Sequence, residues 1–226
     1  MDPSDLPPAP AASGALDPGS LRSGPDQAER RLVLLHGWGA DADDLLDLGR
    51  ELVGPSVSLV ALRAPGLHPA GSGRQWYGLA PAPDWTALPD ARAELRRRLL
   101  DLGASVPLQC TALLGFSQGG AMAVDVATVG APQETGAAAL PLAALISCSG
   151  YPHPGWQPRA AGLPVLLTHG QQDPVVPSEA CDALEQGLLA AGADVTRRLF
   201  PGGHGIDPAL FPLMRAFLEQ AWQRGA

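Results

Sequence analysis

Cysteine is scarce in this chain and shows no recognisable pairing. The 226 residues include three cysteines, Cys110, Cys148 and Cys181, which are far apart and form no Cys-x-x-Cys pair. The sequence therefore indicates neither a disulfide framework nor a zinc site. There is also no His-x-x-x-His pattern and no clustered carboxylate set of the kind that holds a metal. We expect no metal and no cofactor.

Long apolar runs and massed positive charge are missing as well. No run approaches the roughly 18 residues of a membrane-spanning helix. The N-terminus has neither the basic region nor the apolar region of a secretory signal. We therefore expect no membrane span and a cytoplasmic location. The net charge of −8 argues against a nucleic-acid partner. The densest basic cluster is expected on the solvent face of an amphipathic helix and comprises Arg92, Arg96, Arg97 and Arg98.

The chain divides into a short tail and one domain. Residues 1–28 are rich in Pro, Ala, Ser, Gly and Asp and lack hydrophobic periodicity, so they are predicted to be a disordered tail. Residues 29–226 are predicted to form a single domain. Hydrophobic residues make up 46% of the chain, and its length allows one well-buried core.

Short apolar runs alternate with longer amphipathic segments along the predicted domain. Strands are expected at Arg31–Leu35, Val57–Leu62, Thr111–Phe116, Leu142–Ser147, Val165–His169 and Asp194–Phe200. Helices are expected at Asp41–Val53, Leu88–Gly103, Gly119–Val129, Ser178–Ala191 and Pro208–Gln220, with Asp41, Asp43 and Asp44 at the positive end of the first. This alternation, with strands apolar at consecutive positions, predicts an α/β fold. Its central sheet would be mostly parallel, with helices on both faces.

A Gly-x-Ser-x-Gly motif stands between one of these strands and its helix. It comprises Gly115-Phe116-Ser117-Gln118-Gly119. A serine on such a sharp strand-to-helix turn has its hydroxyl pushed out of the sheet edge. The two glycines are expected because a Cβ at either position would collide with the neighbouring strand or helix. The motif predicts Ser117 as a nucleophile.

A serine nucleophile needs a base, and the chain offers five histidines. Sites in parallel sheets lie beyond the carboxyl ends of the strands. His204 lies in a glycine-rich loop between the last predicted strand and helix, and it is the preferred base. His169 also ends a strand, but we expect it to be packed and hydrogen-bonded. His68 and His153 lie in Pro/Gly-rich loops and are expected to be ordinary surface residues.

The base in turn needs an acid that orients its ring. Asp173, in the loop after the strand that ends at His169, is the leading candidate. A turn or helix-capping role is the alternative for this residue. Asp207 lies only three residues from His204 and opens the last helix, so a cap explains it better. The chain order of Ser117, Asp173 and His204 matches the order expected for such an elbow.

An oxyanion hole needs two fixed N–H donors. The amide of Gln118, directly after the serine, is expected to supply one. The other is expected from Trp38, in the turn Leu35-His36-Gly37-Trp38-Gly39 after the first core strand.

Several of these segments together resemble the carboxylesterase/phospholipase family of α/β-hydrolases, which includes acyl-protein thioesterases and bacterial carboxylesterases. The similar segments are Leu-Leu-His-Gly-Trp-Gly-Ala, Gln-Trp-Tyr, Gly-Phe-Ser-Gln-Gly-Gly-Ala-Met-Ala, Asp-Pro-Val-Val-Pro and Gly-Gly-His-Gly-Ile. The similarity runs from about Arg31 to the C-terminus. It implies an α/β-hydrolase fold, and it implies the same triad of Ser117, Asp173 and His204 with oxyanion donors at Trp38 and Gln118.

The resemblance also implies where the acyl group binds. Arg74-Gln75-Trp76-Tyr77 resembles the family's element that lines the acyl site, which makes Trp76 and Tyr77 the expected substrate-binding residues. Gly78 stands where the family usually has aspartate. Cys148-Ser149-Gly150-Tyr151 resembles the segment opposite the nucleophile. Trp85 and Trp156 are candidates for either this site or the core.

The predicted function is a serine hydrolase that cleaves esters or thioesters of short to medium acyl groups through an acyl-enzyme. Small-molecule esters and acylated proteins are the expected partners, and family members commonly form homodimers. One alternative is another serine hydrolase of this fold, such as a lysophospholipase, lipase or peptidase. A dienelactone-type hydrolase would have cysteine in place of Ser117. The other alternative is a non-catalytic scaffold that binds an acyl ligand, although such proteins usually lose a triad residue.

Overall fold

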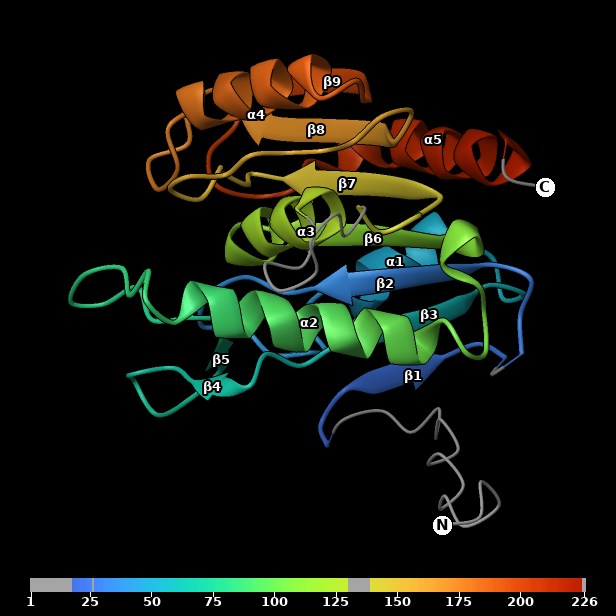
Figure 1. Cartoon of the computed structure of the whole chain (residues 1–226), viewed down its shortest axis with the longest axis horizontal. Helices are drawn as coiled ribbons and strands as arrows, with labels where there is room; N and C mark the ends of the chain where they lie inside the picture. Colours follow the sequence, from blue (N-terminus) through green and yellow to red (C-terminus); the bar gives the residue numbers. More distant parts are fainter. Residues whose placement is uncertain (1–17, 26, 130–138, 225–226) are drawn as a thin grey trace, which may run out of the picture.

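The centre of the fold is a seven-stranded sheet with the order β1-β3-β2-β6-β7-β8-β9 (Figure 1). The computed structural model describes residues 18–25, 27–129 and 139–224. Strand β1 pairs antiparallel with β3, and the other neighbours pair parallel. The strands are β1 (Leu21–Ser23), β2 (Arg31–Leu35), β3 (Ser58–Leu62), β6 (Thr111–Phe116), β7 (Ala144–Cys148), β8 (Pro164–Gly170) and β9 (Asp194–Phe200).

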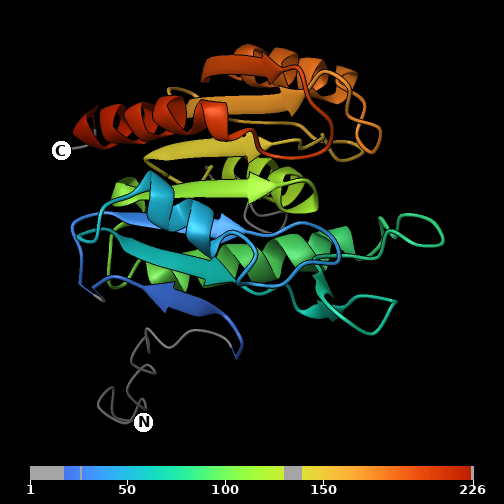
Figure 2. The same cartoon turned by 180° about the vertical axis from the view of Figure 1, so that it is seen from behind.

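Helices cover both faces of this sheet. One face carries α2, α3 and α4 (Figure 1), and the other carries α1 and α5 (Figure 2). Alternate residues of each strand enter the two cores. Val33 and Leu35 pack with the first group of helices, while Leu32 and Leu34 pack with the second. The helices are α1 (Leu46–Leu52), α2 (Leu88–Leu102), α3 (Gln118–Thr128), α4 (Glu179–Ala190) and α5 (Phe211–Arg224).

These layers explain why the apolar runs do not alternate with polar residues. All five residues of β2, of β3 and of β7 are buried, because helices cover both sides of each strand. This confirms the predicted α/β fold with a mostly parallel sheet. None of the helices within the described ranges is both long and apolar enough to cross a membrane.

The structure corrects the predicted boundary of the N-terminal tail. Residues 21–23, which the composition assigned to the tail, form β1, and Leu21 pairs with Ala61 of β3. The backbone groups of β3 on that side would otherwise form an open sheet edge, and β1 satisfies them. Residues 1–17 of the predicted tail lie outside the described residues.

The first predicted helix is shorter than expected. Helix α1 begins at Leu46, not at Asp41, and the segment before it consists of turns. Asp41 is therefore not at a helix end. Its carboxylate instead makes an ion pair of 2.7 Å with Arg63, after the neighbouring strand β3. The pattern showed an acidic cluster but not its partner.

The arginine cluster of α2 is also not a purely solvent-exposed face. Arg98 is 7% exposed, and its guanidinium donates to the carbonyl of Arg63 at 2.6 Å. Arg92 points inward and pairs with the buried Asp125 of α3 at 2.8 Å. The helical spacing was right, but the long side chains reach partners in the neighbouring layer.

Candidate active site

The site is built at the carboxyl ends of the parallel strands. Ser117 directly follows β6, between that strand and α3. Its backbone has φ 53° and ψ −118°, and its N–H donates to the carbonyl of Cys148 at 2.8 Å. A positive φ is unfavourable for a residue with a side chain and is found where the surrounding structure enforces it. Here it is the strained turn that the Gly-x-Ser-x-Gly motif predicts.

Glycines allow the strand and the helix to approach at this turn. A Cβ added at Gly119 would lie 2.5 Å from the carbonyl oxygen of His36 and closer still to that of Leu35. A Cβ at Gly115 would overlap the backbone of Gly119 itself. The obstacles are backbone atoms, which cannot rotate away.

We expect Gly119→Ala to be severely destabilising. The new methyl group must push α3 away from β2, an overpacking that costs about 3 kcal/mol. The measurement is the free energy of unfolding by urea. Gly54→Ala is the matched control, since nothing lies within 4 Å of a Cβ there and the φ of Gly54 is not positive. Equal stability of the two variants would contradict the close approach.

Ser117, His204 and Asp173 form one hydrogen-bonded chain. The Ser117 hydroxyl lies 2.9 Å from Nε2 of His204, and Nδ1 of His204 lies 2.7 Å from Oδ2 of Asp173. A carboxylate only accepts, so Nδ1 carries the proton and Nε2 is left to accept from the serine. Phe116 packs against the imidazole with ring centroids 4.9 Å apart. Three loops remote in sequence therefore meet at this point.

Asp173 is itself held firmly. Its side chain is fully buried, and Oδ1 accepts the backbone N–H groups of Val175 and Val176 at 2.9 Å each. Burial by itself would raise the pKa of Asp173. The hydrogen bonds from Val176, His204 and Val175 outweigh it and hold the pKa below its ordinary value. The carboxylate thus stays ionised and fixes the ring of His204.

The alternatives weighed for base and acid have other roles. His169 is buried and donates from Nε2 to the carbonyl of Val176 at 2.9 Å, which confirms that it is packed and hydrogen-bonded. Asp207 accepts the N–H of Ala209 at 2.9 Å, which confirms the cap. His68 is half-buried and lies edge-on against Trp38.

The surface placement expected for His153 is wrong. His153 as a residue is 3% exposed, and its ring lies 2.6 Å from Asp125 and 2.8 Å from the Tyr77 hydroxyl. The signal missed in the sequence is Asp125, the one charged residue of the predicted helix Gly119–Val129. A buried carboxylate needs a charged or hydrogen-bonding partner, and Arg92 and His153 supply it.

The predicted oxyanion turn lies against the serine. A Cβ added at Gly37 would lie 3.5 Å from Cβ of Ser117, so Trp38 follows at close range. Gln118 is the first residue of α3, and N–H groups in a helix's first turn have no acceptor within the helix. Gly39 has φ 84°, and its N–H donates to the carbonyl of Arg74 at 2.8 Å. Trp38 is 36% exposed as a residue, and its indole N–H donates to the side chain of Gln75.

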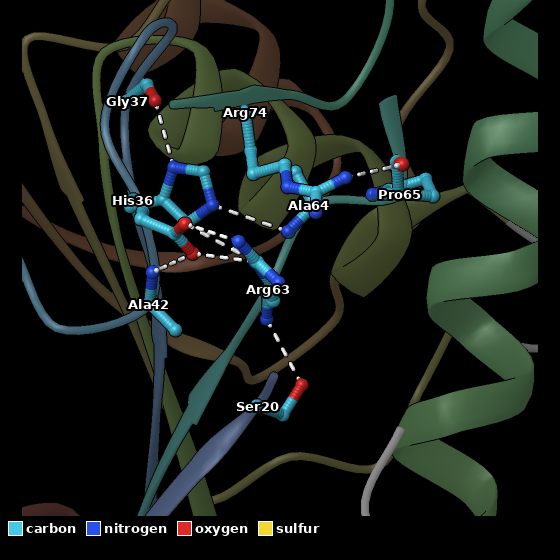
Figure 3. Close-up of polar contacts among 9 residues, drawn as sticks. Ser20, His36, Gly37, Ala42, Arg63, Ala64, Pro65 and Arg74 are labelled. Atoms are coloured by element: carbon cyan, nitrogen blue, oxygen red, sulfur yellow. Dashed lines mark hydrogen bonds and ion pairs between the residues drawn. The ribbon is translucent and has the colours of Figure 1, made fainter. Parts of the chain in front are cut away.

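A network of hydrogen bonds around His36 and Arg63 holds the oxyanion turn in place (Figure 3). His36 is 1% exposed; its Nδ1 donates to the carbonyl of Gly37 at 2.8 Å, and its Nε2 accepts the N–H of Ala64 at 3.1 Å. The backbone N–H of Arg63 donates to the hydroxyl of Ser20, and its guanidinium forms an ion pair with the carboxylate of Asp41. Burial alone would raise the pKa of Asp41, but the bonds from Arg63 and Ala42 hold it below the ordinary value.

We expect His36 to make stability fall on mild acidification. Burial is the main cause that lowers the pKa of His36 from 6.5. Between pH 6.5 and that lower pKa, the unfolded chain binds a proton that the folded chain does not, so the free energy of unfolding rises with pH. The stability that depends on neutral His36 is fully present above pH 6.5, and it is lost as the pH falls from 6.5 through the lowered pKa. The free energy of unfolding is measured in urea at several pH values from 8 to 5. Plotted against pH, it should have a steeper slope for the natural protein than for His36→Asn. Parallel slopes would contradict the assignment.

Trp76 and Tyr77, the two residues expected at the acyl site, are hydrogen-bonded through their backbone to the first residue of α3. The side chain of Gln118 accepts the N–H of Trp76 at 3.0 Å and donates to the carbonyl of Tyr77 at 2.8 Å. The indole of Trp76 donates to the carbonyl of His36 at 2.9 Å. Both aromatic residues are almost fully buried, at 4% and 3% exposure. Trp156 instead packs over Gly187 and donates to Thr128; it is partly buried and lies against the core beneath α3 and α4.

Comparison with known proteins shows the family of this chain. Residues 19–222 match the family model described as phospholipase/carboxylesterase. The chain belongs to this family. The match begins just before β1, in keeping with the corrected tail boundary. Membership makes the chain a hydrolase of carboxylic esters on an α/β-hydrolase fold, as its sequence predicts.

Individual esterases are similar to this chain over most of its length. Esterase YpfH of Escherichia coli is 26% identical over 192 residues, which cover 81% of this chain and 79% of that protein. The crystal structure of esterase PE8 is 30% identical with a TM-score of 0.76, covering 89% of this chain and 97% of that one. The crystal structure of the Bacillus cereus carboxylesterase is 22% identical, with a TM-score of 0.76. The match covers 89% of this chain and 93% of that one, and it shows that the two proteins share a fold.

Proposed function

We propose that this protein hydrolyses its substrates by two-step acyl transfer on Ser117. His204 takes the proton of the serine hydroxyl as Oγ attacks the carbonyl carbon, and then gives it to the leaving alcohol or thiol. Water activated by the same ring then attacks the acyl-enzyme, the Ser117–acyl bond breaks, and the free acid leaves. Asp173 keeps the imidazole oriented and stabilises its charged form.

The observation that carries this proposal is the continuous hydrogen-bonded chain from Ser117 through His204 to Asp173, at 2.9 Å and 2.7 Å. The backbone N–H groups of Trp38 and Gln118, beside the serine, are proposed as the donors to the oxyanion. These donors would cost no reorganisation, because the His36 network and the start of α3 fix them.

Short to medium acyl groups are the proposed substrates, as oxygen esters or as thioesters, and acylated proteins belong to the same chemical class. Trp76 and Tyr77 are proposed to border the acyl group. Trp85 packs against Tyr77 with ring centroids 5.6 Å apart, which adds apolar surface on that side. Aromatic side chains around a site favour apolar acyl groups.

Turnover of a matched acyl series tests this function. The natural protein is assayed with p-nitrophenyl esters from acetate to decanoate and with the corresponding acyl thioesters. We expect kcat/KM to be highest within the short to medium chains and to fall for the longest. A non-catalytic scaffold that merely binds acyl ligands would bind these compounds without turnover, and that result would contradict the proposal.

A further inference from the structure

The segment 74–77 hydrogen-bonds to both halves of the proposed oxyanion hole. One half is the turn after β2, which carries the N–H of Trp38, and the other is the start of α3, which carries the N–H of Gln118. The neighbouring strands β2 and β6 stay in register as far as the pair of Leu35 and Gly115. Both loops leave the sheet beyond that pair, so the separation of the two donors depends on contacts outside the sheet.

The first part of this segment holds the turn. The N–H of Gly39 donates to the carbonyl of Arg74 at 2.8 Å, and the N–H of Arg74 donates to the carbonyl of Ala40 at 2.7 Å. The indole of Trp38 donates to the side chain of Gln75 at 2.9 Å. The residue that carries the proposed donor and the two residues after it are therefore bonded to this segment.

Trp76, the next residue, hydrogen-bonds to both halves itself. Its backbone N–H donates to Oε1 of Gln118 at 3.0 Å, and its indole N–H donates to the carbonyl of His36 at 2.9 Å. Nε2 of Gln118 donates to the carbonyl of Tyr77 at 2.8 Å, which fixes the orientation of the amide. These three bonds are buried, and they join neutral groups. Their direction therefore depends on no protonation state.

The carbonyl of His36 lies where the turn and the helix meet. A Cβ added at Gly119 would lie 2.5 Å from this oxygen, so α3 packs directly against it. His36 stands two residues before Trp38, and a rotation of its peptide group would move the peptide groups that follow. Without the indole N–H of Trp76, this carbonyl would lose a buried donor, a cost that a shift of the turn could reduce.

We propose that Trp76 is a positioning residue that sets the separation of the two oxyanion donors. This inference rests on the proposed function of Ser117. An oxyanion hole acts through donors placed where charge develops, so a shift of either donor weakens binding of the transition state more than binding of the substrate. A residue that merely borders the acyl group would act through apolar contact, and its effect would grow with the length of the acyl chain.

Replacing Trp76 by 3-benzothienylalanine tests this role, because sulfur takes the place of the indole N–H and the ring keeps its size. We expect kcat and kcat/KM for p-nitrophenyl esters to fall together by about 10- to 100-fold, and equally for acetate and hexanoate. Loss of a whole donor would cost about 100- to 1000-fold. The same replacement of Trp222 is the control and should keep the natural rates, since this indole donates to the carbonyl of Cys110, before the start of β6.

The outcomes of this comparison are distinct. Rates of the Trp76 variant within about two-fold of the natural protein would overturn the inference and leave the proposed function standing. A loss that grows from acetate to hexanoate would do the same, because it would assign Trp76 to the acyl chain alone. No turnover of any ester by the natural protein would instead contradict the proposed function.

Inhibitor binding separates an effect on the oxyanion from general damage to the site. Oγ of Ser117 adds to the carbonyl carbon of a hexyl trifluoromethyl ketone, the serine proton passes to His204, and the carbonyl oxygen becomes an oxyanion. The alcohol of the same chain binds without this step. In the Trp76 variant, the Ki of the ketone should rise by the factor by which kcat/KM falls, while the Ki of the alcohol stays constant. Equal weakening of both would overturn the inference.

A second variant, Gln118→Met, reaches the same contacts from α3. Methionine is similar in length, removes both side-chain bonds and leaves the backbone N–H in place. Its loss of kcat should again be equal for acetate and hexanoate. Because both replacements act through one segment, the double variant should lose less activity than the product of the single losses. Losses that multiply would mean that Trp76 and Gln118 act separately, and would contradict the inference.

Discussion

Replacing Ser117 by alanine is expected to lower kcat for p-nitrophenyl esters by about a million-fold, with the folded structure retained. The hydroxyl is the atom that forms the acyl bond in the proposed mechanism, and no other group in the chain of His204 and Asp173 can replace it. The binding groups and the oxyanion donors would remain, so a residual rate above that in water is expected. Stopped-flow assays of ester hydrolysis give the rate of the natural protein, and long-term assays give the rate of Ser117→Ala.

The matched control for this variant is Ser178→Ala. Ser178 stands before α4 and makes no side-chain cap hydrogen bond there, so its hydroxyl has no expected part in the reaction. Its activity should equal that of the natural protein. Activity of Ser117→Ala within a few-fold of this control would remove Ser117 from the mechanism.

Replacing Asp173 by asparagine is expected to lower kcat by about 10⁴-fold with little change in KM. Asparagine keeps an oxygen for the N–H groups of Val175 and Val176, so the loop should keep its shape. When this oxygen accepts from Val175 and Val176, the NH2 group of the asparagine faces Nδ1 of His204, and that group can only donate a hydrogen bond. The proton of the ring then moves to Nε2, which can no longer accept from Ser117.

Asp207→Asn is the control, since either side chain can cap the turn at Ala209. The pH profile of kcat distinguishes orientation from mere loss of structure. A wrong ring tautomer lowers kcat across the neutral range without lowering the melting temperature. A variant that loses activity only in proportion to its folded fraction would contradict the orienting role.

The local patterns of the sequence were enough to predict the fold and the relative positions of the three key residues. Strands such as Arg31–Leu35 and Thr111–Phe116 match the structure because burial on both faces leaves one consistent pattern. The glycines around Ser117 predicted a close approach that the backbone of His36 and Leu35 confirms.

Contacts between distant polar residues were beyond the reach of those patterns. The spacing of Asp41 suited a helix start, and nothing local pointed to Arg63 across the neighbouring strand. His153 read as a surface residue because its loop is rich in Pro and Gly, while its partner Asp125 lies 28 positions earlier. The tail boundary failed for the same reason, because β1 is stabilised by pairing with β3 and has little hydrophobic pattern of its own.

Labelling with a fluorophosphonate tests most directly whether Ser117, His204 and Asp173 act as one unit. Intact-protein mass spectrometry and peptide mapping after brief treatment should show one adduct per chain of the natural protein, on Ser117. Ser117→Ala should gain no adduct, and His204→Ala should react far more slowly. A natural protein that hydrolyses esters yet carries its adduct on another residue, or on none, would contradict the account.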